Sequence, residues 1–229
     1  VAWEGIRLED YAGIELERVD VLGWGGGPRT YNSAIRGIVL NNGAAVWLTR
    51  VFSDSVIGDG MYIGNTQFVF SLSLESSLAL GHGIILDNIS KGVFTNTLIN
   101  GATGITGAVA GAAGLFVQNC TDNVFTNTYA YNCTGSGIYV TTGCARNSFS
   151  NSSVNSNGFG LAILSTAATT KFSGGSMTAN TTPVSNTATG TGNVIQDITG
   201  YNPVGAAAVT TGGSPWTYTA GASPEILYY

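Results

Sequence analysis

The chain carries a short pattern, glycine followed by apolar, any and apolar residues, that recurs at regular intervals. The pattern begins at Gly13, Gly37, Gly60, Gly83, Gly114, Gly137 and Gly160, with spacings of 24, 23, 23, 31, 23 and 23. One further step of 23 from Gly160 reaches Pro183 and Val184, so we expect an eighth, weaker repeat. Alternation of apolar positions over a few residues is typical of a β-strand.

A second ladder of apolar residues runs beside the first. It consists of Phe70, Phe94, Phe125, Phe149, Phe172 and Ile195, with spacings of 24, 31, 24, 23 and 23. Asparagine follows two positions after the phenylalanine in three successive repeats, at Asn96, Asn127 and Asn151. Each repeat therefore contains two short strands with turn residues between them.

Repeats of this kind stack in register, so equivalent residues of neighbouring coils lie one strand spacing apart, about 4.8 Å. Inward apolar residues then form a continuous core, and glycine ahead of a strand permits a corner that a Cβ would obstruct. Crossovers between parallel strands are right-handed. The sequence therefore predicts an all-β protein: a single-stranded right-handed parallel β-helix of about 7–8 coils over residues 1–199.

One spacing of 31 indicates an insertion of about eight residues near residues 100–113, in the Gly/Ala-rich segment NGATGITGAVAGAA. The coils on either side stay in register, so the insertion must loop out. Surface loops carried by a rigid scaffold often bind ligands. The alternative is an excursion without function.

Both ends of the solenoid need protection, because a β-helix exposes strand edges there. At the N-terminus the pattern is already present at Gly5-Ile6-Arg7-Leu8, with no amphipathic helix before it, so we expect more chain or a partner ahead of Val1. The repeat ends after about Asp197. Short aromatic-rich strands are predicted at 214–219 and 226–229, and residues 200–229 are expected to form a capping or oligomerisation tail.

The composition argues against two kinds of partner, nucleic acids and membranes. Charged residues make up 9% of the chain and the net charge is −5, with eight Lys and Arg in total. Nucleic-acid binding requires a basic surface, so no nucleic-acid partner is expected. No apolar run approaches the roughly 18 residues of a membrane span, so no membrane insertion is expected. The few charges and the many Ser, Thr, Asn and Gly residues indicate an extracellular, cell-surface or virion location.

Three cysteines leave two arrangements open. Cys120 and Cys144 have the same spacing as Phe125 and Phe149 and should occupy adjacent coils, either as a disulfide or as two buried reduced thiols. Cys133 falls elsewhere in the coil and is expected to be a buried free thiol. Because there is no CxxC pair and a single histidine, no zinc site and no cofactor are expected.

One column of residues contains side chains suited to catalysis or binding. The position before the repeating glycine is occupied by Arg36, Asp59 and His82 in successive coils, which places a cation, a carboxylate and an imidazole on one face. Such a column suits a sugar-binding or acid/base site. Asp59 and His82 are the candidate catalytic residues and Arg36 a binding residue. Of the nearby acidic residues Asp54, Glu75 and Asp87, the candidates for binding are Asp54 and Asp87.

The segments Gly58-Asp59-Gly60-Met61 and Gly81-His82-Gly83-Ile84 resemble the GDD…GHGI pattern of polygalacturonases, β-helical glycoside hydrolases. The resemblance implies inverting hydrolysis of pectin, with one aspartic acid as general acid and two aspartates activating water. The sequence departs from that pattern, because Gly58 replaces one aspartate, Arg36 stands at another, and the Arg-Ile-Lys motif is missing. Inversion needs two carboxylates roughly 6.5–9.5 Å apart, and only Asp59 aligns.

Pectate lyases, which are also β-helices, offer a second enzymatic comparison. They hold Ca²⁺ in a carboxylate cluster, and hard cations need several converging oxygens. Asp54 and Asp59 alone provide few such oxygens.

The ladders as a whole look like those of phage or archaeal-virus tailspikes and fibres, and of pectate-lyase-like surface proteins. The segments GYNPVG at 200–205 and SPWTYT at 214–219 add to this resemblance. It implies a non-catalytic fibre module that contacts polysaccharide. We expect the chain to self-associate, as a homotrimer or as an end-to-end filament. The alternatives are a polysaccharide-degrading glycoside hydrolase or lyase with its site at Asp59 and His82, and the subunit of an end-to-end stacked filament.

Overall fold

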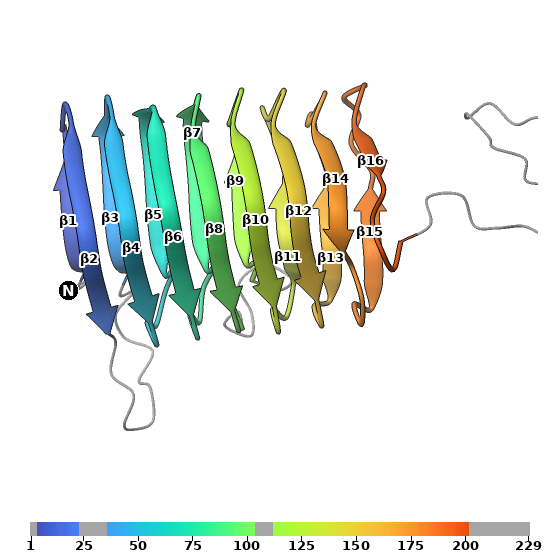
Figure 1. Ribbon diagram of the computed structural model, residues 1–229, viewed down its shortest axis with the longest axis horizontal. Coiled ribbons are helices and arrows are strands. Elements are labelled where there is room, and N and C mark those ends of the chain that lie inside the picture. Colours follow the sequence, from blue (N-terminus) through green and yellow to red (C-terminus); the bar gives the residue numbers. More distant parts are fainter. Residues whose placement is uncertain (1–3, 23–35, 104–111, 202–229) are drawn as a thin grey trace, which may run out of the picture.

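The computed structural model describes residues 4–22, 36–103 and 112–201, which form a solenoid of strands without helices (Figure 1). The chain alternates between two parallel eight-stranded sheets, called here the odd sheet and the even sheet. The odd sheet contains β1 (Glu4–Glu9), β3 (Arg36–Gly43), β5 (Met61–Gln67), β7 (Ile84–Ser90), β9 (Leu115–Gln118), β11 (Ser136–Val140), β13 (Phe159–Ile163) and β15 (Thr182–Asn186). The even sheet contains β2 (Ile14–Leu22), β4 (Val46–Asp54), β6 (Val69–Ser77), β8 (Val93–Asn100), β10 (Val124–Tyr131), β12 (Ser148–Asn155), β14 (Lys171–Ser176) and β16 (Val194–Gln196).

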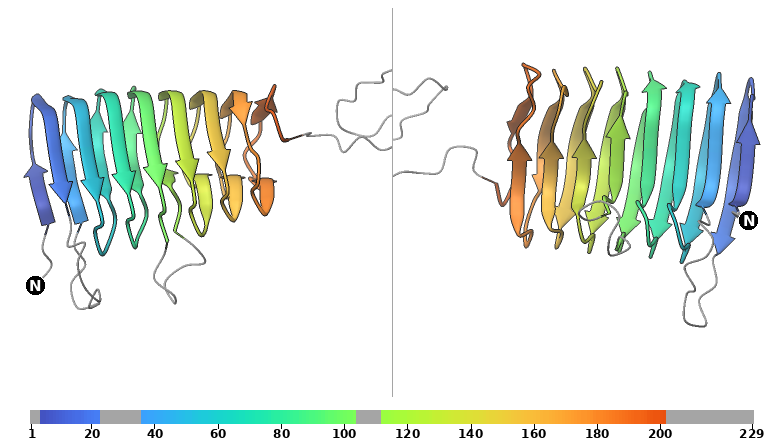
Figure 2. Two further views of the ribbon diagram at one scale, coloured as in Figure 1. Left: turned by 60° about the horizontal axis from the view of Figure 1, so that its bottom comes forward. Right: turned by 180° about the vertical axis from the view of Figure 1, so that it is seen from behind.

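The predicted parallel β-helix is confirmed, with two strands in each of eight coils stacked side by side (Figure 2). In the odd sheet Ile38 pairs with Met61, Met61 with Ile84, and Ile84 with Leu115. The longer step from Ile84 to Leu115 is therefore accommodated without loss of register. The predicted insertion falls between β8 and β9, where residues 104–111 lie outside the described residues.

The assignment of Gly13 to the glycine ladder is wrong. Ile14 pairs with Val46 in the even sheet, whereas Ile6 pairs with Ile38 in the odd sheet. Gly5 is thus the first glycine of the ladder, and the step from it to Gly37 is longer than the usual period. The error arose because both strands of the first coil show the same apolar alternation. It concealed a second long connection, residues 23–35, which lies outside the described residues.

The assignment of Phe70 to the aromatic ladder is also wrong. Ser71 pairs with Phe94, which places Phe70 on the outward face, where its side chain is 37% exposed. A shift of one residue moves a strand side chain to the opposite face of the sheet. The inward ladder begins at Phe94 and continues through Phe125, Phe149 and Phe172, whose ring centroids are 4.7, 4.3 and 4.2 Å apart with nearly parallel planes.

Glycine precedes the odd strands because the chain approaches itself closely at these corners. A Cβ on Gly60 would collide with the hydroxyl of Ser76 and with the carbonyl oxygen of Gly83 in the next coil. The corner therefore favours glycine through close packing.

The predicted asparagine column lies at a bend inside the even-sheet strands. Asn96, Asn127 and Asn151 have left-handed φ angles of 55°, 56° and 52°. Asparagine tolerates this conformation better than most residues. Nδ2 of Asn127 also donates a hydrogen bond of 3.0 Å to Oδ1 of Asn96.

A second asparagine ladder, not foreseen from sequence, is buried. Oδ1 of Asn123 accepts a hydrogen bond from the backbone N–H of Gly92 at 2.7 Å, and its Nδ2 donates to Oδ1 of Asn147 at 2.9 Å. Nδ2 of Asn147 donates in turn to the carbonyl oxygen of Cys120 at 2.8 Å. These side chains satisfy backbone groups at the corners that the strand ladders leave unpaired.

All three cysteines are buried free thiols. Of the two arrangements left open for Cys120 and Cys144, the structure shows the reduced pair. Each Sγ is instead directed to a backbone carbonyl oxygen, that of Leu86 at 3.5 Å for Cys120 and that of Val117 at 3.3 Å for Cys144. The predicted burial of Cys133 as a free thiol is confirmed.

The expected tail falls almost entirely outside the described residues. Only Gly200 and Tyr201 of 200–229 are described, so the strands predicted at 214–219 and 226–229 and their capping role stay predictions. The expectation of chain or a partner ahead of Val1 likewise stays a prediction.

Candidate functional site

Arg36, Asp59 and His82 lie in three adjacent coils at the edge where the odd strands begin. The backbone N–H of Gly37 donates to the carbonyl oxygen of Asp59 at 3.1 Å, and that of Gly60 donates to the carbonyl oxygen of His82 at 2.9 Å. The three residues are called the Arg–Asp–His row below. Their juxtaposition follows from the register of β3, β5 and β7, as the repeat spacing indicated.

Both carboxylate oxygens of Asp59 have partners within the chain. Nε of Arg36 donates to Oδ2 at 3.2 Å, and the backbone N–H of His82 donates to Oδ1 at 3.0 Å. The side chain of Asp59 is only 17% exposed. This carboxylate therefore closes a corner of the coil and neutralises the guanidinium beside it.

The imidazole of His82 is also held by the fold. Its Nδ1 accepts a hydrogen bond of 2.9 Å from the backbone N–H of Ala113, and its ring packs against Phe116 with centroids 4.8 Å apart. Burial lowers the pKa of His82, although the charge of the Asp59 carboxylate acts in the opposite direction. The imidazole is therefore neutral at pH 7, with Nδ1 acting as an acceptor.

Asp87 belongs to the same outward face as the row. Tyr62 donates its hydroxyl to Oδ2 of Asp87 at 3.3 Å, and Asn119 donates Nδ2 to Oδ1 at 3.0 Å. The Arg36 guanidinium lies 4.9 Å from the centre of the Tyr62 ring, a cation–π contact. Burial and the Asp87 charge raise the pKa of Tyr62, while Arg36 lowers it. Asp87 is thus linked to the row through Tyr62.

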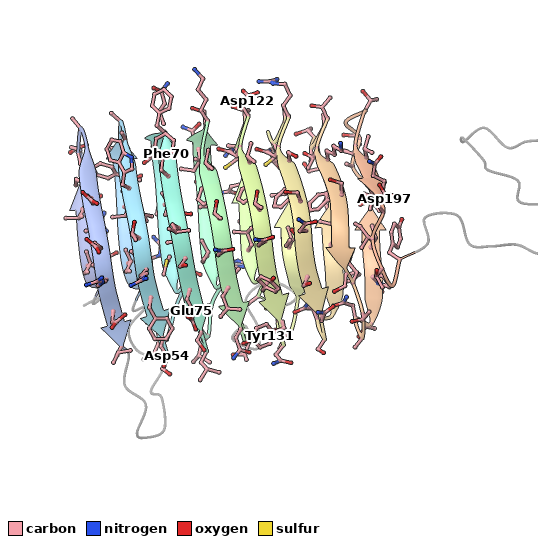
Figure 3. All side chains as sticks on the ribbon, viewed as in Figure 1. Asp54, Phe70, Glu75, Asp122, Tyr131 and Asp197 are labelled. Atoms are coloured by element: carbon pink, nitrogen blue, oxygen red, sulfur yellow. The ribbon has the colours of Figure 1, made fainter. Side chains whose placement is uncertain are left out.

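Asp54 does not join the row. It ends β4 on the even sheet and accepts a hydrogen bond from the hydroxyl of Ser55 at 3.1 Å. Figure 3 shows Asp54 and Glu75 at the same end of the even-sheet strands. Burial, assisted by the Asp54 charge, raises the pKa of Glu75. Within the described ranges, no hydrogen bond or ion pair connects Asp54 to Asp59.

The described residues lack two further kinds of feature. They contain no group of three or more His, Cys, Asp or Glu side chains that could hold a metal ion. They also contain no helix long and apolar enough to cross a membrane.

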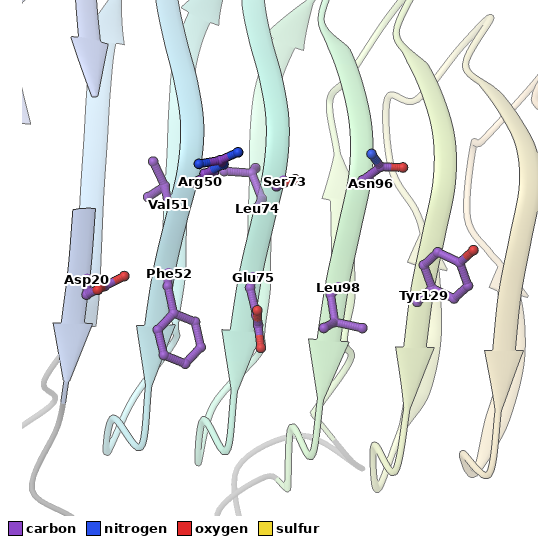
Figure 4. Close-up of a pocket in the computed structure, with 10 residues that line it drawn as sticks. All are labelled: Asp20, Arg50, Val51, Phe52, Ser73, Leu74, Glu75, Asn96, Leu98 and Tyr129. Atoms are coloured by element: carbon purple, nitrogen blue, oxygen red, sulfur yellow. The ribbon is translucent and has the colours of Figure 1, made fainter. Parts of the chain in front are cut away.

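A groove of about 660 Å³ lies on the outward face of the even sheet (Figure 4). Strands β2, β4, β6, β8 and β10 each contribute to it, and the register places one residue from each strand in a single row across them. This row consists of Asp20, Phe52, Glu75, Leu98 and Tyr129. Arg50 lines the groove at the bend of β4, where its φ is 56°.

The polar groups of the groove differ from those of the Arg–Asp–His row. In the part of the chain that the structure describes, the side chains of Asp20, Arg50, Glu75 and Tyr129 make no hydrogen bond and no ion pair. The charge of the neighbouring Asp54 carboxylate contributes to the raised pKa of Glu75. The groove therefore has free donors and acceptors beside apolar surface.

This groove was not predicted from the sequence, although a signal was available. Phe52, Glu75, Leu98 and Tyr129 have spacings of 23, 23 and 31, which are also spacings of the glycine ladder. Glu75 was predicted only as an acidic residue near the row. The period identifies the outward positions of the second strand as readily as the positions before the glycine.

Comparison with known proteins agrees with this architecture. Residues 4–177 match the family model described as a right handed beta helix region. Among solved structures, a mutant of the periplasmic alginate epimerase AlgG aligns with a TM-score of 0.55 and 13% identity, covering 86% of this chain. The chain spans 42% of the epimerase chain, and at this identity the likeness concerns the fold alone. No curated protein matches in sequence. The chain belongs to the right-handed β-helix family.

Proposed function

We propose that the chain is a non-catalytic, fibre- or tailspike-like structural module of an extracellular, cell-surface or virion protein, and that it contacts glycans. The observation that supports this most strongly is the hydrogen bonding of the Arg–Asp–His row within the chain. Both oxygens of Asp59 and Nδ1 of His82 accept hydrogen bonds from the chain itself.

General acid–base catalysis requires a side chain that can reach the proton to be transferred. Asp59 is engaged by Arg36 and by the backbone of His82, so its hydrogen bonds stabilise the coil. Inverting hydrolysis also needs a second carboxylate across the bond. The two candidates are occupied elsewhere, Asp87 by Tyr62 and Asn119, and Asp54 by Ser55.

Contact with glycans is supported by the fold and by the groove. The fold is shared with a protein whose name describes it as an alginate epimerase, which acts on a polysaccharide. Fold alone does not determine activity. The even-sheet groove, with aromatic, carboxylate and guanidinium side chains on a rigid sheet, is the surface that suits a glycan.

We also propose self-association as a homotrimer, with end-to-end stacking into a filament as the alternative. Among the described strands, β1 and β15 form the edges of the odd sheet, and β2 and β16 form those of the even sheet. Unpaired strand edges favour pairing with another chain, and this observation supports the end-to-end alternative. The mass of the protein in solution distinguishes monomer, trimer and filament.

The second candidate function is degradation of a polysaccharide by hydrolysis or elimination. The observation in its favour is the Arg–Asp–His row itself, which brings a cation, a carboxylate and an imidazole together where strands β3, β5 and β7 begin. In this alternative Asp59 and His82 are catalytic, and Arg36 and Asp87 bind the substrate.

The test is a screen against acidic polysaccharides, pectin and alginate among them. New reducing ends report hydrolysis, and the absorbance of unsaturated uronates reports elimination. We expect no turnover by the wild-type chain. Turnover that is lost in Asp59→Ala, with the fold retained by circular dichroism, would overturn the proposal in favour of the enzyme.

A further inference from the structure

We infer that the even-sheet groove is a binding site for an uncharged glycan, with Glu75, Arg50 and Tyr129 as its main contacts. The inference rests on the proposed contact with glycans. It goes further by assigning that contact to a particular face, away from the Arg–Asp–His row, and to a chemical class of ligand.

The dimensions of the groove agree with a small-ligand site. Ligand pockets typically have volumes of roughly 300–1,000 Å³, and this groove measures about 660 Å³. It follows the bend of the even strands, where Arg50, Ser73 and Asn96 have left-handed φ angles of 56°, 63° and 55°. The bend is repeated in successive coils, so the groove extends across several strands. An elongated ligand such as a sugar chain fits this shape.

The apolar part of the groove offers surface for the C–H faces of sugar rings. Phe52 and Leu98 are partly exposed on either side of Glu75. Tyr129, the last of these groove residues, is 44% exposed (Figure 4). Aromatic side chains provide large contact area at low conformational cost, and tyrosine adds a hydroxyl. Neighbouring strands hold these residues about 4.8 Å apart, so they form a pre-organised platform.

The polar part of the groove offers the complementary hydrogen bonds. The carboxylates of Asp20 and Glu75 accept, the guanidinium of Arg50 donates, and the Tyr129 hydroxyl does both. In the described ranges none of these groups has a hydrogen-bond partner within the chain. Sugar hydroxyls donate and accept at short intervals and can therefore pair with all of them. In the Arg–Asp–His row, by contrast, both oxygens of Asp59 and Nδ1 of His82 already accept hydrogen bonds from the chain, so the row has fewer unpaired acceptors to offer.

Charge selects among glycans. The groove contains Asp20 and Glu75 against the single cation Arg50, and the nearby Asp54 adds a further negative charge. Like charges at short range repel, most strongly where water is partly excluded. A uronate chain would carry one carboxylate per sugar into this field. The groove therefore favours uncharged glycans over polyuronates such as alginate or pectin.

The test is affinity electrophoresis of the whole chain in gels that contain dextran, galactomannan, soluble β-glucan, alginate or polygalacturonate. We expect retardation by at least one neutral polysaccharide and none by the two polyuronates. Tyr129→Ala and Glu75→Gln should each weaken the affinity by about tenfold or more, the effect of losing one good contact.

Two matched variants serve as controls. Phe159→Ala removes an aromatic side chain of similar exposure, 41%, from the odd sheet. Glu15→Gln removes an exposed carboxylate of the even sheet that lies outside the groove. Both should bind within about twofold of wild type, well under 1 kcal/mol. Thermal unfolding of every variant verifies that the fold is retained.

Three results of the electrophoresis would overturn the inference: retardation by polyuronates alone, no retardation by the neutral polysaccharides, or retardation unchanged in Tyr129→Ala and Glu75→Gln. The last would leave the proposed glycan contact in place but on another surface. Conversely, groove-dependent binding accompanied by cleavage of the glycan would support the groove while refuting the non-catalytic function. A solution mass that falls in Tyr129→Ala would identify a second copy of the chain as the occupant and also overturn the inference.

Discussion

Nε of Arg36 lies 3.2 Å from Oδ2 of Asp59, one coil further along the solenoid. In the polygalacturonase pattern that these segments resemble, an aspartate would occupy the position of Arg36. Here a cation faces the carboxylate instead, and the resulting ion pair is partly shielded, with side-chain exposures of 39% and 17%. The pair therefore stabilises the corner where β3 and β5 begin, in place of a second acidic group.

Removing the charge of Asp59 should consequently affect stability. In Asp59→Asn we expect the free energy of unfolding to fall by about 1 kcal/mol, because the partly shielded ion pair is lost. Urea denaturation followed by circular dichroism measures the change. Asp122→Asn, in the more exposed pair with Arg146, is the control and should lose less. Equal losses in the two variants would show that the Arg36–Asp59 pair stabilises the fold no more than the exposed pair does.

The phenylalanine ladder should dominate the stability of the central coils. Phe149 is fully buried between Phe125 and Phe172, so Phe149→Ala should lower the free energy of unfolding by about 3–5 kcal/mol. Phe159→Ala, whose ring is 41% exposed, should change it by about 0.5 kcal/mol or less. Chemical denaturation of both variants tests the contrast, and similar losses would refute the assigned register.

The buried asparagine ladder should be sensitive to truncation. Asn123→Ala leaves the backbone N–H of Gly92 without its acceptor and opens the link to Asn147. A buried unpaired donor costs about 1–3 kcal/mol, so we expect a loss of that size in urea denaturation. Thr95→Ala, at a partly exposed position of β8, is the comparison and should be nearly neutral. A neutral Asn123→Ala would show that water replaces the side chain.

The single histidine should make stability depend on pH. Folding lowers the pKa of His82, so below its ordinary value of 6.5 the unfolded chain binds a proton more readily than the folded chain. The free energy of unfolding should therefore fall as the pH decreases from about 6.5 towards the folded-state pKa, and this contribution is then fully lost.

The comparison of wild type with His82→Gln isolates this contribution, because no other histidine is present. Urea midpoints at pH 7.5 and at pH 5.5 provide the measurement. The difference between the two pH values should be smaller in the variant. A difference that is unchanged by the substitution would show that His82 does not titrate differently on folding.

The thiols should be unreactive while the chain is folded. Burial raises the pKa of Cys120 and Cys144, and raises that of Cys133 to about 11, so little thiolate forms at neutral pH. Iodoacetamide should leave the native protein unmodified and add three groups once urea unfolds it without reductant. Intact mass reports the number. A single addition that rises to three only after reduction would reveal a Cys120–Cys144 disulfide.

The repeat was predictable because, in a solenoid, residues that pair between neighbouring coils are separated by a nearly constant number of residues. Steps such as Ile38 to Met61 to Ile84 preserve the inward face, and the step to Leu115 needs only a loop. Spacing alone does not distinguish the two strands of a coil where both show the same apolar alternation, as at Gly13, which precedes a strand of the even sheet. Phe70 fits the ladder by spacing although it lies outside it, because its spacing to Phe94 equals that of a true step of the ladder, from Phe125 to Phe149.

The candidate site was predictable only in part. The alignment of Arg36, Asp59 and His82 follows from register, but their hydrogen bonds do not. The N–H that occupies Nδ1 of His82 comes from Ala113, beyond the insertion, and no local pattern specifies its position. The groove depends on outward residues of five strands, so its row could be counted from sequence while its volume depends on the strand bend.

The most direct test of the proposed function is the length of a polysaccharide after contact with the protein. Each polysaccharide of the panel would be incubated with the wild-type chain and then sized by gel filtration with light scattering. We predict that the neutral glycan which retards the protein keeps its molar mass distribution, as do alginate and polygalacturonate. Shortened chains that Asp59→Ala no longer produces would contradict the account.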